Sequence, residues 1–157
     1  MDGKQYITYK KGYSFNYNSN DVDGIVTLLE CFAKEAESDL FNAYHIKNFI
    51  LSHKDHEDGV IITLENNGKT IGVICGMVRQ HVYDPEKIIL VEMAWYVDKK
   101  HRATKYSLKL LKLFEQKGKE LGVCKIFVTL RSSLKSVEKV YTRLGYIEEE
   151  KTFSRDI

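Results

Sequence analysis

The sequence has a single proline, three cysteines and no long apolar run, and each scarcity excludes a class of protein. One proline in 157 residues, without a low-complexity tract, argues against disorder or a long linker. No apolar run approaches the roughly 20 residues that span a bilayer. The N-terminal residues also lack the apolar segment of a signal peptide. We therefore expect one domain over residues 1–157, cytoplasmic and without a membrane partner.

The cysteines and the histidines of the segment 53–59 do not show the spacing of a metal-binding cluster. Cys31, Cys75 and Cys124 are widely spaced and odd in number, which predicts buried reduced thiols rather than disulfides or a metal site. His53 and His56 stand in the segment HKDHEDG, whose charged residues predict a solvated loop. We therefore expect no bound metal ion.

Positive charge is concentrated in the second half of the chain. The segment from Asp98 to Arg143 contains thirteen Lys and Arg and four Asp and Glu, so it carries +9 and the remainder −7. This asymmetry indicates an anionic ligand or partner, although a solvated lysine face on a helix would explain part of it. Nucleic-acid binding is an alternative that no recognition motif supports.

Apolar spacing predicts a β-α-α-β-β-β-α-β-α-β order of elements. The short connections between the middle strands make them antiparallel, with a hairpin at Asn67-Gly68 and a turn at 84–86. A strand, helix and strand after residue 88 predict a parallel pair. The expected elements are a strand within 5–17, a helix from an Asn20 cap to Ser38, a helix over 42–51, strands over 59–64, 70–83 and 88–97, a helix over 104–121, a strand over 123–130, a helix from Ser132 or Ser133 to 144, and a strand over 146–153.

The strand over 88–97 is apolar on both faces, which is typical of a central strand. Glu92 is its one charged residue. Burial would raise the pKa of this carboxylate toward neutrality, which makes it a candidate general base. A Glu held in an ion pair, or one that reaches solvent at a bulge, remains the alternative.

Two further features carry candidate chemistry. The basic segment Arg102–Ser107 opens a helix and can offer backbone N–H groups and positive charge to a phosphate, unless it is only a basic loop capped by Thr104. Tyr141 lies late in the last helix. Its phenol is either a packing residue or a proton donor to a leaving group.

These motifs resemble the GNAT superfamily of acetyl-CoA-dependent N-acetyltransferases, whose element order matches the predicted one. Residues 102–107 are similar to the family's acyl-CoA motif, Arg/Gln-x-x-Gly-x-Gly/Ala, but Lys105 and Ser107 replace its glycines. The stretch from Tyr141 to Tyr146, YTRLGY, matches the family's Tyr-x-x-Leu-Gly-Phe/Tyr ending at each fixed position.

The resemblance implies an α/β (α+β) fold with a mixed, mostly antiparallel central sheet of six to seven strands and about four helices. It implies acetyl transfer from acetyl-CoA, without a metal, to a primary amine of a small molecule or a protein. Glu92 would be the base and Tyr141 the acid. The residues implied to bind acetyl-CoA are Trp95, Tyr96, Val97, Arg102, Ala103, Thr104, Lys105, Tyr106 and Ser107.

Three questions stay open at the level of the sequence. The substituted glycines favour a catalytically inactive GNAT-fold module that serves binding or assembly. A homodimer is neither indicated nor excluded. The segments that shape the acceptor site in the family contain acidic residues that would suit a cationic amine or would simply form a solvated surface. These are Glu30, Glu35, Glu37, Asp39, Asp84 and Glu86.

Overall fold

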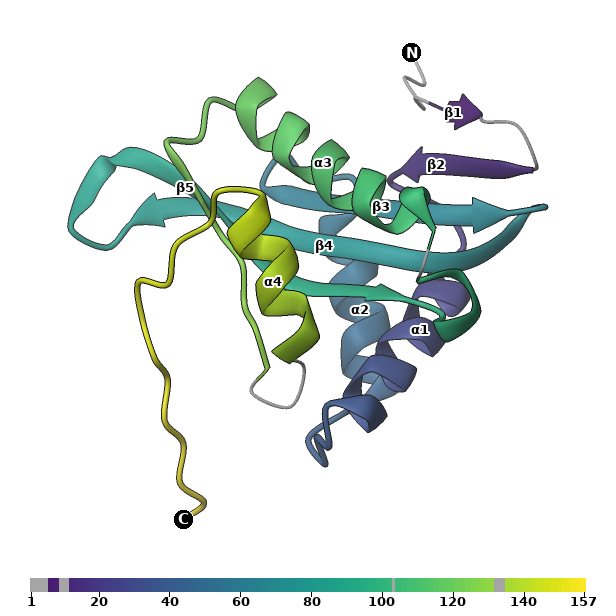
Figure 1. The fold of residues 1–157 in the computed structure, drawn as a ribbon, viewed down its shortest axis with the longest axis horizontal. Coiled ribbons are helices and arrows are strands. Elements are labelled where there is room, and N and C mark those ends of the chain that lie inside the picture. The colour runs from purple at the N-terminus through teal and green to yellow at the C-terminus, as the bar shows by residue number, and fades with distance from the viewer. Residues whose placement is uncertain (1–5, 9–11, 103, 132–134) are drawn as a thin grey trace.

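A computed structural model gives the fold (Figure 1) and describes residues 6–8, 12–102, 104–131 and 135–157. Our expectations for Ala103, Ser132 and Ser133 therefore lie outside the described residues. The elements are β1 (Tyr6–Thr8), β2 (Tyr13–Tyr17), α1 (Val22–Glu35), α2 (Ala43–His53), β3 (Gly59–Asn66), β4 (Lys69–His81), β5 (Asp84–Val97), the 3₁₀ helix η1 (Lys99–His101), α3 (Lys105–Glu120), β6 (Lys125–Phe127) and α4 (Lys135–Arg143).

The described strands form a single mixed sheet whose spatial order, β1-β2-β3-β4-β5-β6, follows the chain. Consecutive strands from β1 to β5 pair in antiparallel fashion, whereas β6 runs parallel to β5. Asn67 and Gly68, with φ values of +49° and +78°, form the tight turn between β3 and β4. The mostly antiparallel sheet, the parallel pair and the Asn-Gly hairpin are therefore confirmed.

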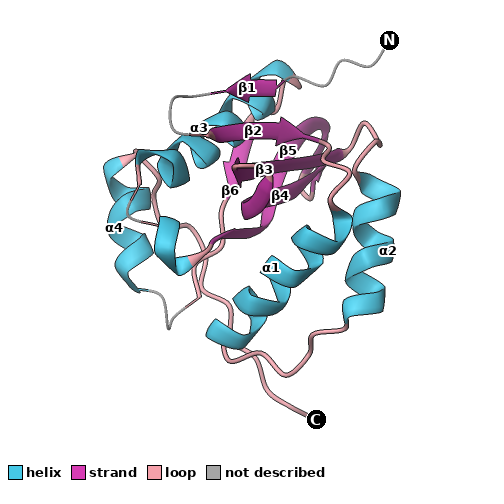
Figure 2. Ribbon diagram, turned by 90° about the vertical axis from the view of Figure 1, so that its right-hand side faces the viewer, coloured by secondary structure: helices cyan, strands magenta, loops and turns pink. Residues whose placement is uncertain are grey.

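The helices cover both faces of the sheet (Figure 2). Helices α1 and α2 pack on one face, where Ile25 and Ile50 meet strand residues such as Ile61. Helices α3 and α4 pack on the other face, where Phe114 and Tyr141 join a second apolar cluster. The described residues thus contain the expected four α-helices, and β5 is covered on both sides.

Helix α1 begins one residue later than the sequence suggested. Its cap is Asp21, whose carboxylate accepts the Gly24 N–H at 3.0 Å. The predicted cap, Asn20, instead accepts a hydrogen bond from the Lys54 ammonium at 3.1 Å. The prediction was wrong because two neighbouring Asx residues have the same capping chemistry.

The predicted turn at 84–86 is also wrong. His81 pairs with Asp84, so Val82 and Tyr83 form the turn and β5 starts at Asp84. The proline follows the first residue of β5, a position where a strand tolerates the loss of a donor.

The strand expected over 146–153 is not formed, because residues 146–157 contain no helix or strand. This segment includes three successive glutamates, which suit a strand poorly. Its Glu149 contacts β6 through a side-chain ion pair with Lys125 at 2.7 Å rather than through a backbone ladder. The predicted number of six to seven strands in the central sheet had included this last strand.

A β-bulge and an early divergence of strands shape the centre of β5. Cys75 pairs with Ala94 and Gly76 pairs with Glu92, so Met93 is the extra residue. The pairing with β6 spans only Ile89–Val91. From Glu92 onward, the β6 side of β5 therefore has no strand partner among the described residues.

Candidate active site

Glu92 is the buried acid at the point where β5 and β6 diverge. Only 4% of its surface is exposed. Its Oε2 accepts the Thr129 N–H at 2.9 Å, and the described residues give Oε1 no hydrogen bond. Burial raises the pKa of Glu92 to about 7, although the Thr129 N–H acts in the opposite direction. Such a carboxylate can accept a proton near neutral pH.

Tyr141 lies beside this acid on the face covered by α3 and α4. Its ring packs between Trp95, at 6.0 Å between centroids, and Tyr146, at 5.4 Å. Burial raises the pKa of the Tyr141 phenol, and the charge of Glu92 adds to the rise. The phenol therefore stays protonated, which is the form a general acid needs.

A cavity of about 320 Å³, here called the α3 cavity, opens at the start of α3. Leu108 and Val140 line it together with residues predicted to bind acetyl-CoA. These are Trp95, Arg102, Thr104, Lys105 and Ser107. Three other predicted residues, Tyr96, Val97 and Tyr106, are buried and do not line this cavity, and Ala103 is outside the described residues.

Two donors suit the α3 cavity for a ligand rich in oxygen. Thr104 makes no side-chain cap to α3, because its hydroxyl donates instead to the His101 carbonyl at 2.8 Å. The start of α3 thus keeps the positive potential of an uncapped helix end. The Trp95 Nε1–H is buried without a hydrogen-bond partner in the described residues. The residues present therefore fit a phosphate-bearing ligand.

The residues that replace the motif glycines both line the α3 cavity at the helix start. The Lys105 side chain is exposed, and its ammonium lies 5.5 Å from the centroid of the Tyr106 ring. The Ser107 hydroxyl donates to the Arg102 carbonyl at 2.8 Å. Both substituents are thus accommodated by contacts within their own loop and helix.

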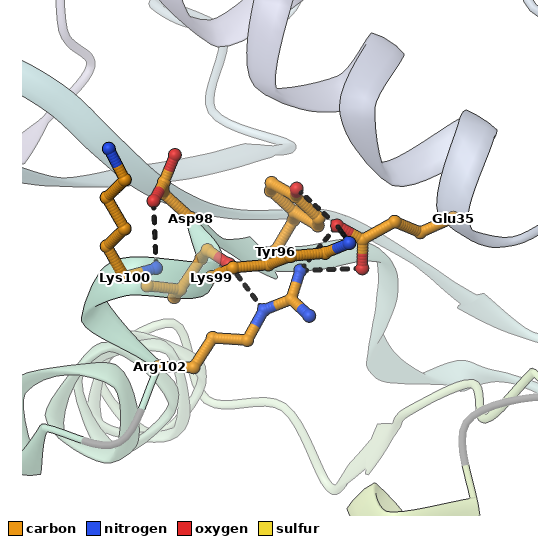
Figure 3. Close-up of polar contacts among 7 residues, drawn as sticks. Glu35, Tyr96, Asp98, Lys99, Lys100 and Arg102 are labelled. Atoms are coloured by element: carbon orange, nitrogen blue, oxygen red, sulfur yellow. Dashed lines mark hydrogen bonds and ion pairs between the residues drawn. The ribbon is translucent and has the colours of Figure 1, made fainter.

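The Arg102 guanidinium is bound by a residue that the motif did not identify (Figure 3). It donates to both carboxylate oxygens of Glu35, at 2.9 and 2.8 Å, and its Nε–H donates to the Val97 carbonyl at 2.7 Å. The Tyr96 hydroxyl also donates to Glu35, at 2.7 Å. Figure 3 shows this cluster joining the end of α1 to the loop before α3.

The cluster keeps Glu35 ionised. Burial by itself would raise the pKa of Glu35, but hydrogen bonds from Tyr96 and Arg102 and the charges of Arg102 and Lys99 outweigh it. The pKa of Glu35 is therefore lower than usual. Arg102 is positioned by this carboxylate and lines the α3 cavity at the same time.

A second, apolar pocket of about 170 Å³ lies between α1, α2 and the sheet and is called the α1/α2 pocket. Met93 and Ala94 of the bulge form part of its wall. None of the six acidic residues considered for the acceptor site lines it, and Glu35 is bound to Arg102. Those acids therefore do not create an acidic lining for this pocket.

Metal-ligand clusters and membrane-length helices are both lacking in the part of the chain that the structure describes. No group of three His, Cys, Asp or Glu side chains there could hold a metal ion. No helix there combines the length and apolar character needed to cross a bilayer.

The family of the chain follows from this fold and from a direct comparison. The profile of the acetyltransferase (GNAT) family matches residues 23–146. The chain therefore belongs to the GNAT acetyltransferase family, as its motifs predicted. No curated protein matches it.

Solved structures share the fold at low identity. A possible acetyltransferase from Clostridium difficile 630 is 15% identical, with a TM-score of 0.71 over 88% of this chain and 92% of that chain. Glucosamine-6-phosphate N-acetyltransferase from Arabidopsis thaliana is 13% identical, with a TM-score of 0.73 over 92% and 97%. AAC(6')-Iy in complex with the bisubstrate analog CoA-S-monomethyl-acetylneamine is 13% identical, with a TM-score of 0.71 over 87% and 91%.

Sequence reasoning missed two contacts of the site residues and the bulge in β5. The Thr129 donor is a backbone N–H and therefore leaves no trace in residue type. Glu35 is 67 positions from Arg102, so only the fold brings them together. The bulge at Met93 left no signal in the sequence, because Met93 is one apolar residue among others in this strand, and its 50% exposure becomes visible only in the structure.

Proposed function

We propose that this chain is an N-acetyltransferase that transfers an acetyl group from acetyl-CoA to a primary amine. The observation that carries the proposal is the α3 cavity, which gathers five predicted cofactor residues beside the buried Glu92 strand. A cavity at an uncapped helix start suits a pyrophosphate. An unpaired strand edge suits an extended amide chain, which can pair with it as an added strand.

Each predicted residue has a role in this reaction. Backbone N–H groups of the Arg102–Ser107 segment bind the phosphates, and the β5 edge at Trp95–Val97 pairs with the amide arm. Bound acetyl-CoA supplies an activated acetyl thioester. Glu92 takes the proton that the amine loses as it forms the N–C bond, and Tyr141 protonates the departing sulfur. No covalent intermediate on the protein is required.

The competing proposal is an inactive module with the same fold. The two substituted glycines motivate it, since glycine lets backbone approach a ligand closely. The contacts of Lys105 and Ser107 weaken this alternative, because both side chains are bound within their own segment.

Calorimetric titration with acetyl-CoA and, separately, with CoA tests the cofactor part of the proposal. We expect micromolar dissociation constants for both. The absence of binding at millimolar concentration would favour the inactive module. A salt-sensitive interaction with RNA or DNA in that case would promote nucleic-acid binding.

A further inference from the structure

The α1/α2 pocket has its sheet-side wall next to the proposed base. Cys75, Met93 and Ala94 belong to that wall, and Met93 follows Glu92 directly in β5. A ligand in this pocket therefore has one end at the bulge. Proximity to Glu92 makes this pocket a candidate for the acceptor rather than for acetyl-CoA, whose residues line the α3 cavity.

The lining of the pocket selects an apolar group. Phe32, Phe41 and Phe49 contribute rings from α1, the following loop and α2. A cavity of about 150 Å³ lined by Leu, Ile and Phe binds benzene in another protein. This pocket, at about 170 Å³, therefore has room for one aromatic ring or a branched aliphatic side chain.

The same lining disfavours an acceptor with several positive charges. No lining residue among those described is acidic. Glu30 is paired with Lys34 at 2.9 Å, and Glu35 with Arg102 at 2.8 Å. A second ammonium inside the pocket would lose its water without gaining an acidic partner among the lining residues, which is unfavourable.

Arg131 is the one charged residue that lines the pocket. It is exposed, and the described residues give its guanidinium no ion pair or hydrogen bond. A guanidinium binds a carboxylate through two parallel hydrogen bonds. The pocket therefore combines an apolar interior with a site for one negative group.

We propose that the acceptor is an apolar α-amino acid, whose side chain occupies the α1/α2 pocket and whose carboxylate pairs with Arg131. This inference rests on the proposed acetyl transfer. The α-amine forms the new N–C bond as the thioester C–S bond breaks. The proton lost by the amine passes to Glu92, and the leaving sulfur takes the proton of Tyr141.

An acceptor panel at saturating acetyl-CoA tests the substrate class. We expect kcat/KM for L-phenylalanine to exceed that for 2-phenylethylamine at least tenfold, and that for spermidine at least a hundredfold. Faster turnover of spermidine or L-lysine would overturn the substrate class while leaving acetyl transfer intact. Equal values for L-phenylalanine and 2-phenylethylamine would overturn the carboxylate contact.

The variant Arg131→Gln isolates that contact. It should lower kcat/KM for L-phenylalanine at least tenfold and leave 2-phenylethylamine within twofold. Arg79→Gln is the matched control, because Arg79 is an exposed arginine on β4 that lines neither cavity. Equal losses for both substrates in Arg131→Gln would contradict the inference.

Direct binding separates this inference from the proposed reaction. Titration of L-phenylalanine, with and without CoA, should show binding to the wild type. Ala33→Phe, which places a ring in the pocket, should abolish it while its circular dichroism stays unchanged. Such a result without acetyl transfer would refute the reaction and keep the amino-acid site. No binding of L-phenylalanine overturns the inference, whether or not another amine is acetylated.

Discussion

Glu92 shows how one backbone donor can orient a buried acid without ionising it fully. The Thr129 N–H binds Oε2 and lowers the pKa, but burial has the larger effect and leaves the pKa at about 7. A raised pKa means that the folded protein prefers the protonated acid. The stability due to this preference is complete below the unfolded pKa and is lost as the pH rises through about 7.

Glu92→Gln should therefore change both rate and stability. We expect kcat/KM to fall at least a hundredfold at pH 7.5, since an amide cannot accept the proton. The rise of the wild-type rate through about pH 7 should disappear. The wild type should lose about 3 kcal/mol of unfolding free energy between pH 4.5 and pH 8 relative to the variant.

Steady-state kinetics and urea unfolding across this pH range measure both effects. Titration with CoA is the control, because the variant should bind it as tightly as the wild type. A variant with the wild-type rate at each pH would remove Glu92 as the base.

Tyr141→Phe tests the proposed acid at the same scale. The ring contacts with Trp95 and Tyr146 survive in phenylalanine, so the thermal midpoint should change little. The chemical step should slow by about 10²–10⁴-fold, the usual contribution of a positioned acid. Single-turnover kinetics measure it. A wild-type rate in this variant would leave Tyr141 as a packing residue.

At the scale of elements, the end of α1 is attached to the loop before α3 by a single carboxylate. Glu35 binds Arg102 through two oxygens and accepts the Tyr96 hydroxyl. Because the pKa of Glu35 is lowered, this stabilisation is present at neutral pH. It is lost as the pH falls through that pKa.

Glu35→Gln should destabilise the protein by about 1 kcal/mol at pH 7, since it weakens a partly buried hydrogen bond from Tyr96 and two solvent-screened bonds from Arg102. It should also weaken CoA binding, because Arg102 loses its orientation. Glu30→Gln is the control on the same helix. Its exposed pair with Lys34 is screened by solvent, so its loss should have a much smaller effect.

Thermal unfolding and calorimetry with CoA compare the two variants. Equal stability of Glu35→Gln and Glu30→Gln would show that the cluster does not hold α1 to the loop. Tighter CoA binding in Glu35→Gln would mean that the carboxylate competes with the phosphates for Arg102.

At the scale of the molecule, the sequence predicted the elements better than their ends. Alternating or helical spacing predicted the four helices and the parallel pair, but also a last strand over 146–153 that is not formed. The choice between Asn20 and Asp21 involves a contact with a distant residue, because Lys54 binds the Asn20 side chain. The strand expected over 123–130 forms only over Lys125–Phe127. Glu92 and the residues around Arg102 were predicted as candidates from their chemistry, whereas their contacts with Thr129 and Glu35 required the fold.

The C-terminal segment gives a prediction at this scale. Phe153 and Ile157 are at least 90% exposed, and residues 146–157 contain no helix or strand. Deletion of residues 151–157 keeps the Lys125–Glu149 ion pair and should shift the thermal midpoint by no more than about 1 °C. Differential scanning calorimetry measures this. A fall of several degrees would indicate that the segment adds a strand to the sheet.

The ion pair between Glu35 and Arg102 connects the elements that line the two cavities. Helix α1 lines the α1/α2 pocket, and Arg102 lines the α3 cavity. If a ligand in the α1/α2 pocket displaces the end of α1, Arg102 is disturbed as well, and the affinity of the α3 cavity then changes. Thermodynamic linkage requires both affinities to change by the same factor. In that case the ligands of the two cavities would bind cooperatively or antagonistically rather than independently.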